Sequence, residues 1–194
     1  MIALGLLLQG GLPSRGPGIL ADAMSVAIEL ANETAEEAKT RDRLVRVLDT
    51  YPLERWQFTD RVRIEEGAIS HSHPVLTLGT GYPSDLAVLS SYLHEQLHWY
   101  AASRAGNDAV MKQLRDRYPD PPIGFPDGAR EEHSSYVHYH VCLLELRSLA
   151  ELIGAEAARG LVLSIPYYRS IYRDVVEDEE FLAGLFEGQG LLPK

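Results

Sequence analysis

The run from His94 to His98 constrains this chain more than any other part of its sequence, because it reads His-Glu-x-x-His. Two histidines four residues apart lie on one face of a helix, where they can bind a single zinc ion. Glu95 follows the first histidine by about 100° around the helix axis. It can therefore take a proton from a water molecule at the metal without being a ligand itself.

The neighbouring sequence predicts that this run lies in a helix preceded by two strands. Residues 60–64 and 73–78 have the composition of strands, and a turn rich in glycine separates the second strand from the helix. Ser84 or Asp85 is expected to cap the helix, and Gly106 is expected to end it. Spacings of three and four residues predict one buried stripe, formed by Leu86, Leu89, Leu93 and Leu97.

A zinc site of this type needs a third protein ligand and leaves the fourth position to water. Residues 130–153 have helical periodicity, and Gly154 can terminate that helix. His138 and Glu145 fall in the middle of its apolar side, where a polar side chain is costly unless it is paired or bound to a metal. That apolar side is formed by Val141, Cys142, Leu146, Leu149, Leu152 and Ile153.

Of these two polar residues, His138 is the predicted third ligand. Glu145 lies two turns further along the helix, about 10.5 Å away, so the two cannot bind one ion together. Glu145 is instead expected to anchor a histidine or an arginine from the side. Two alternatives stay open: Glu145 or Glu131 is the ligand in place of His138, or His138 and Glu145 belong to a buried polar network without metal.

The other histidines are weaker candidates. His133 and His140 are expected opposite the apolar stripe, on the solvated side of their helix. His71 and His73 alternate in or just before a strand, so their side chains can point the same way and bind metal. The alternative for this pair is a surface turn beside Pro74.

With this motif and a third ligand on a later helix, the chain resembles small zincin metallopeptidases, most closely the gluzincin type, over about residues 60–155. No Gly-x-x-His follows His98, which excludes the metzincin pattern. The resemblance implies an α+β fold, predominantly helical, in which a small mixed sheet packs on the motif helix and on a second ligand-bearing helix. It also implies that the strand from Val75 to Leu78 binds an extended peptide by edge pairing.

These residues predict a zinc-dependent hydrolase, most specifically a metallopeptidase acting on a peptide or protein. His94, His98 and His138 are expected to bind Zn²⁺, and Glu95 is expected to act as general base. The alternative is a zincin-like metal-binding module without peptidase activity, either an interaction domain or a non-peptide hydrolase. Candidates for a hydroxyl that stabilises the oxyanion are Tyr136, Tyr168 and Tyr172.

Length and charge narrow the class of protein. At 194 residues with 45% hydrophobic content, the chain is expected to form a single domain over residues 1–194. The formal net charge of −10 argues against nucleic acid or an anionic membrane as a main partner, since both are polyanions. Cys142 is the one cysteine, so no disulfide forms within the chain. The apolar run 2–8 is too short to span a bilayer and follows no basic residue, so a buried strand or arm and a cytoplasmic location are expected.

Three other segments have a predicted conformation. Residues 19–48 are expected to form one or two helices with a break near Asn32. Residues 117–128 contain four prolines and cannot be helical; they form either one wall of a cleft or a surface connection. Pro166 is expected to open a helix that runs into the acidic residues 177–180.

Overall fold

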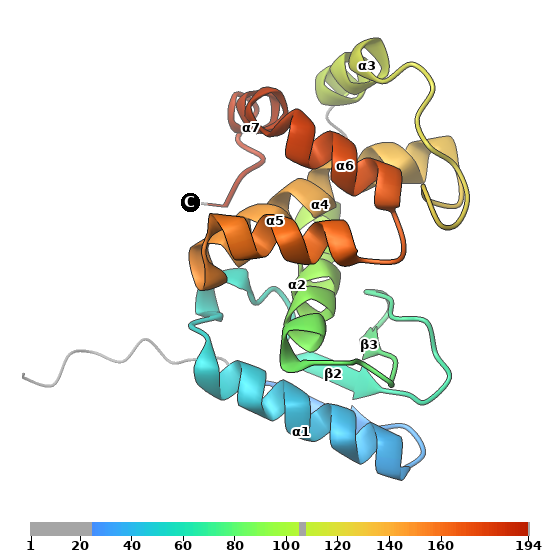
Figure 1. The fold of residues 1–194 in the computed structure, drawn as a ribbon, viewed down its shortest axis with the longest axis vertical. Helices are drawn as coiled ribbons and strands as arrows, with labels where there is room; N and C mark the ends of the chain where they lie inside the picture. Colours follow the sequence, from blue (N-terminus) through green and yellow to red (C-terminus); the bar gives the residue numbers. More distant parts are fainter. Residues whose placement is uncertain (1–24, 105–107, 194) are drawn as a thin grey trace, which may run out of the picture.

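A small parallel sheet forms the amino-terminal part of the structure, a computed structural model that describes residues 25–104 and 108–193 (Figure 1). Its strands are β1 (Ala27–Leu30), β2 (Arg61–Ile64) and β3 (Leu76–Leu78), in that order across the sheet. Both neighbouring pairs are parallel.

Two helices cover this sheet. Helix α1 (Ala35–Thr50) makes the crossover between β1 and β2, and a crossover through a helix brings the next strand back in the same direction. Val62 lies in the middle of the sheet, opposite Ile28 in β1 and Leu76 in β3. Helix α2 (Asp85–Ala102), which carries the His-Glu-x-x-His run, contacts both α1 and the sheet.

The rest of the described chain is helical and gathers around one long helix, α4 (Glu132–Ile153) (Figure 1). Gly154 ends α4 with a φ of 89°, which glycine adopts without strain. Within residues 25–104 and 108–193, every helix is too short or too polar to cross a membrane. Besides α2, α4 contacts α3 (Asp108–Arg117), α5 (Ala155–Ser164), α6 (Arg169–Glu177) and α7 (Glu179–Glu187).

Several predicted features are confirmed. Strands β2 and β3 lie inside the predicted segments 60–64 and 73–78. Ser84 caps α2, because its side chain accepts a hydrogen bond from the Ala87 N–H at 3.1 Å. Helix α2 already ends at Ala102, while the predicted stop at Gly106 and the amino-terminal arm lie outside the described residues.

Three expectations about secondary structure are wrong. Residues 27–30 form β1 instead of a helix, because pairing with β2 overrides their weak helical pattern. The sheet is parallel and not mixed, since α1 reverses the chain between its first two strands. The helix after Pro166 starts only at Arg169, and Asp178 divides the acidic segment between α6 and α7.

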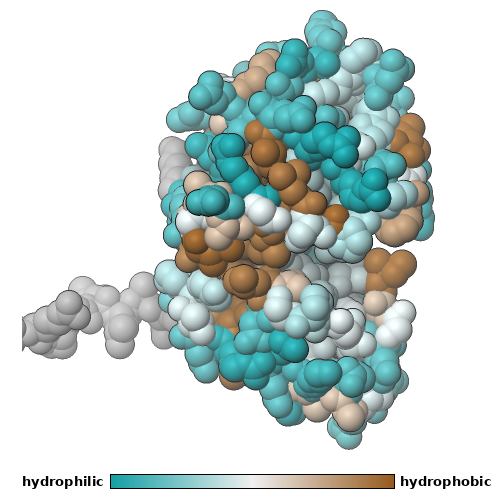
Figure 2. Space-filling view, in the orientation of Figure 1, coloured by the Kyte–Doolittle hydropathy of each residue, from teal (hydrophilic) through white to brown (hydrophobic). Residues whose placement is uncertain are grey.

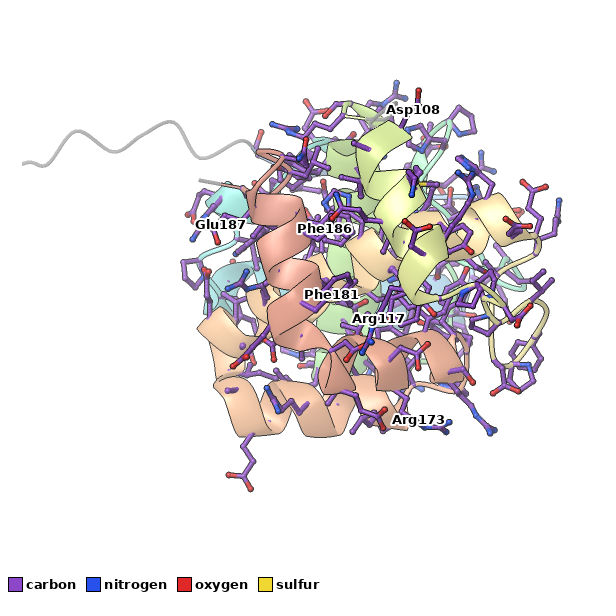
Figure 3. All side chains as sticks on the ribbon, turned by 90° about the horizontal axis from the view of Figure 1, so that it is seen from above. Asp108, Arg117, Arg173, Phe181, Phe186 and Glu187 are labelled. Carbon is purple, nitrogen blue, oxygen red and sulfur yellow. The ribbon has the colours of Figure 1, made fainter. Side chains whose placement is uncertain are left out.

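His140 is buried and not solvated, which corrects its predicted position. Its ring stacks on Phe186 with 4.3 Å between the ring centroids, and its Nε2 donates a hydrogen bond to the Leu191 carbonyl at 2.8 Å. Phe186 points from α7 into the interior in Figure 3. The side of α4 opposite the apolar stripe is therefore covered by α7, so α4 is buried on more than one face.

Gln96 ties α2 to the segment before β2. Its side-chain oxygen accepts hydrogen bonds from the Phe58 and Thr59 N–H groups at 2.7 and 2.9 Å. Its amide nitrogen donates to the Thr59 carbonyl and to the Tyr92 hydroxyl, each at 2.9 Å. Gln96, which lies between the two motif histidines, thus helps to fix the position of α2 relative to the segment before β2.

Glu37 joins the start of α1 to the end of β2. Thr34 and Glu37 form a capping box, and the same carboxylate accepts the Glu66 N–H at 2.9 Å. Burial on its own raises the pKa of Glu37, but hydrogen bonds from Glu66, Asn32 and Thr34 outweigh it and lower the pKa to about 2. The ionised carboxylate therefore stabilises the folded state.

We expect Glu37→Gln to lower stability at neutral pH and to reduce the loss of stability in acid. The stabilisation is complete above the ordinary pKa of 4.5 and is lost as the pH falls from there towards about 2. Urea unfolding followed by circular dichroism between pH 3 and 7 measures the effect. Glu36→Gln, a change at a half-buried residue in the same helical turn, is the control. Parallel pH profiles for wild type and Glu37→Gln would contradict the prediction.

Candidate metal centre

Three histidines from two helices converge beside the middle of α2. His94 and His98 lie one turn apart on α2, and His138 faces them from α4. One ring nitrogen from each lies within 4.8 Å of the other two, and no other such group of histidine, cysteine, aspartate or glutamate occurs in the described part of the chain. The ring centroids are 4.9 to 5.6 Å apart. The structure thus brings together the three residues that the sequence predicts as ligands.

Glu145 holds the first of these rings. Its Oε2 atom lies 2.8 Å from Nδ1 of His94, so the predicted contact between Glu145 and a histidine is present. The carboxylate also accepts hydrogen bonds from Ser90 Oγ at 2.5 Å and from the Tyr172 hydroxyl at 2.6 Å. Since Nδ1 of His94 donates to a carboxylate, its Nε2 is the atom left to accept or to bind a metal.

Burial and charge act in opposite directions on the pKa of His94. Burial alone lowers it, but the hydrogen bond and the negative charge of Glu145 outweigh burial and raise the pKa above its usual value. The raised pKa therefore reflects the contact of 2.8 Å between His94 and Glu145. A bound cation would compete with the ring proton on Nε2 and leave the Nδ1 bond in place.

The other two rings are held in the neutral form. Nδ1 of His138 donates to the Ser134 carbonyl at 2.6 Å, which again leaves Nε2 as the acceptor. Burial and the charge of His94 lower the pKa of His138 to about 4. Burial, His94 and His138 lower the pKa of His98 to about 2. Neutral imidazoles are the state that binds a metal.

This donor set fits a metal ion. Two rings have one nitrogen fixed by an oxygen acceptor and present the other nitrogen to a shared space. Imidazole nitrogens suit zinc, copper, nickel and iron, and three protein ligands leave a position open for water or substrate. The buried carboxylate behind His94 supplies the outer hydrogen bond that metal-binding histidines commonly have.

Glu95 lines a cavity whose wall also includes Tyr168, the residue that packs on His138, while the three histidines themselves are not among the lining residues. Glu95 is only 6% exposed, and the cavity has a volume of about 570 Å³. No hydrogen bond joins its carboxyl group to another residue within 25–104 and 108–193. Burial raises the pKa of Glu95 to about 7; His94 lowers it and Glu145 raises it. Glu95 therefore has the position and the proton affinity of a base that acts on a molecule in the cavity.

The three candidate tyrosines have different surroundings. Tyr168 lines the cavity, and its ring lies 4.1 Å from that of His138. Its backbone is left-handed, with a φ of 53°, which is unusual for a residue other than glycine. The hydroxyl of Tyr172 is bound to Glu145, and that of Tyr136 donates to the Tyr118 carbonyl. Tyr168 is therefore the one of the three whose hydroxyl is available to a substrate.

The remaining candidate ligands do not join the group of three histidines, although His73 and His133 line one cavity together with His98. Glu131 occupies the N-cap position of α4 without a capping hydrogen bond from its side chain and is exposed, and His133 is exposed on the first turn of the same helix. His71 bonds to the Ile69 carbonyl, while His73 stacks on Trp99 with 4.2 Å between the centroids. The structure therefore does not bring His71 and His73 into a joint site.

Edge pairing at β3, which the resemblance implies, is not available. The N–H and carbonyl groups of Thr77 that point away from β2 both bond to His71, at 2.8 and 3.0 Å. Gly79 N–H donates to Ser70 Oγ at 3.0 Å. The segment before β3 folds back and occupies the outer edge of the strand, which the sequence pattern did not reveal.

Ser90 and Tyr172 are the site residues that sequence reasoning missed as partners of Glu145. Ser90 precedes His94 by one turn of α2, so its place on the same face was a usable signal. Tyr172 comes from a separate helix, and its contact depends on how α6 packs against α4.

No protein-family model, no curated protein and no solved structure matches this chain. The resemblance to zincins therefore remains a prediction from the motif and from the arrangement of its histidines.

We expect His94→Ala, His98→Ala and His138→Ala each to lower zinc retention sharply, because each removes one of only three protein ligands. The measurement is zinc content per chain by mass spectrometry after loading and dialysis. His133→Ala removes an exposed histidine from the same helix as His138 and should retain zinc like the wild type. Full zinc content in a variant that lacks both His94 and His98 would rule out this site.

Glu145→Gln should keep the three ligands and weaken zinc binding by about 10–100-fold, because the charged acceptor for His94 is lost. Competition with a chromophoric chelator measures the affinity. Glu151→Gln, an exposed change near the end of the same helix, is the control. An unchanged affinity in a folded Glu145→Gln protein would show that the contact between Glu145 and His94 does not support the site.

Proposed function

We propose that this protein is a zinc-dependent hydrolase, and more specifically a metallopeptidase. One observation carries the proposal: Glu95, a buried carboxyl group without a hydrogen-bond partner in the described chain, lines a cavity and directly follows His94, one of three convergent histidines. Three convergent imidazoles, a coordination position left for water and an adjacent carboxyl group form the set of groups that metal-assisted hydrolysis requires.

The roles of the residues follow from their positions. A zinc ion held by His94, His98 and His138 would supply a Lewis acid that polarises a carbonyl group and acidifies water. Glu95 takes a proton from the attacking water and returns it to the leaving nitrogen. Glu145 fixes the orientation of His94 through its bond to Nδ1.

Tyr168 supports the same assignment. Burial, Cys142 and Glu95 raise the pKa of Tyr168 to about 12, so its hydroxyl keeps its proton at neutral pH. A protonated hydroxyl at the cavity wall can donate a hydrogen bond to a substrate oxygen that gains negative charge. The ring of Tyr168 packs against that of His138, with 4.1 Å between the ring centroids.

We expect Glu95→Gln to abolish turnover and leave zinc bound. Glutamine preserves the size and polarity of the side chain and removes the base, so kcat should fall by about 10²–10⁴-fold or more. A quenched fluorescent peptide library provides the substrate, and zinc content is measured on the same preparations. Glu131→Gln, an exposed change at the start of α4, should behave like the wild type. Normal cleavage by zinc-loaded Glu95→Gln would refute the proposed mechanism.

A further inference from the structure

The most exposed large hydrophobic side chains of the described chain lie at the cavity that Glu95 faces. Ile69 is 89% exposed and Phe125 is 81% exposed, the two highest values among the exposed large hydrophobic residues. Both line that cavity. Large apolar side chains that gather in water at one place mark a binding surface, whereas single ones scattered over a protein do not.

Ile69 and Phe125 come from connections that are far apart in the sequence. Ile69 belongs to the connection between β2 and β3, and Phe125 to the connection between α3 and α4. Figure 2 shows hydrophobic surface on both sides of a hollow at the right edge of the molecule, where these two connections face each other in Figure 1. A side chain that enters the cavity would contact both.

The connection that carries Phe125 is fixed by hydrogen bonds. Gly124 N–H donates to the Ala129 carbonyl at 2.7 Å, which closes the loop at its base. Arg169 N–H donates to the Pro126 carbonyl at 3.1 Å and ties the loop to the start of α6. Phe125 is thus held in water by a braced loop, and a partner would not have to order it on binding.

The connection that carries Ile69 is fixed as well. Ser70 Oγ accepts the Gly79 N–H and lies 2.8 Å from the Tyr82 hydroxyl, and the next residue, His71, pairs with Thr77. Because this pairing occupies the edge of β3, a peptide cannot be recognised there through its main chain. We therefore expect side chains at the cavity to contribute to recognition.

Arg130 adds a positive charge to the cavity. Among the lining residues, Arg130 and Glu95 are the charged ones. No ion pair joins Arg130 to another residue within 25–104 and 108–193, and its neighbour Ala129 is held in the braced loop. An arginine without an ion-pair partner in the described chain can pair with a carboxylate of a bound molecule.

We propose that the cleft takes a polypeptide segment that presents a bulky apolar side chain next to a carboxylate. The apolar side chain packs between Ile69 and Phe125, and the carboxylate pairs with Arg130. This inference rests on the proposed peptidase function, because it assigns the substrate class of the same site.

Binding to the full-length, zinc-loaded Glu95→Gln protein tests the inference without turnover. The probe is the peptide acetyl-Ala-Ala-Phe-Asp-Ala-Ala-amide, with forms that carry Ala for Phe or Asn for Asp, measured by isothermal titration calorimetry. Two further peptides, acetyl-Ala-Ala-Ala-Phe with a free carboxyl end and the same sequence with an amidated end, distinguish recognition of a terminal carboxylate from recognition of an acidic side chain. We expect the peptide that contains Phe to bind about tenfold more tightly than the form with Ala in its place. Loss of the carboxylate should cost about threefold to tenfold.

Variants assign the two preferences to residues. Ile69→Ser combined with Phe125→Ser should remove the preference for Phe, and Arg130→Gln should remove the preference for the carboxylate. Leu163→Ser and Arg173→Gln are matched controls elsewhere on the surface and should keep both preferences. Arg173 lies on α6 and points outward in Figure 3.

Equal affinity for the Phe and Ala peptides, or no measurable binding of any peptide, would overturn the inference. So would a loss of preference in the control variants. Hydrolysis of the same peptides by the wild type is measured separately. Cleavage without preference would contradict the proposed substrate class and agree with the proposed peptidase function. Selective binding without any cleavage would agree with the proposed recognition site and contradict the peptidase function.

Discussion

The buried carboxylate of Glu145 joins three helices of this structure, α2, α4 and α6, through its hydrogen bonds. A carboxylate inside a protein is costly unless hydrogen bonds satisfy it, and loss of a partner leaves an uncompensated buried charge. Glu145 on α4 receives hydrogen bonds from Ser90 and His94 on α2 and from Tyr172 on α6. Satisfying one side chain therefore fixes three helices relative to one another.

The candidate metal centre is a consequence of this packing. His94 is oriented by Glu145, and His138 is oriented by the carbonyl one turn before it on α4. Helix α4 supplies both His138 and Glu145, which lie two turns apart. The same helix therefore provides one candidate ligand and orients a second one, His94, through Glu145. The alternative of a buried polar network without metal shares these contacts, and what distinguishes the two is whether the three free ring nitrogens hold an ion.

The cavity that Glu95 lines is formed by the connections between β2 and β3 and between α3 and α4, together with helical residues. Loops held on a rigid scaffold commonly carry recognition, because their side chains are free of the demands of core packing. Here one connection closes the edge of β3, and the other is braced against α6. Both leave an apolar side chain in water at the cavity, which is why side-chain recognition is the mode we infer for the substrate.

Local sequence was sufficient for features that depend on one helix or one turn. The spacing of His94 and His98, the cap at Ser84, the stop at Gly154, and the position of His138 and Glu145 on an apolar stripe all follow from periodicity within a single segment. Tertiary structure alone decided the rest: β1 and the parallel sheet, the burial of His140 under α7, the closed edge of β3, and Tyr172 as a partner of Glu145. Each of these depends on contacts between segments far apart in the chain, and such contacts leave no periodic signal in the sequence around either partner.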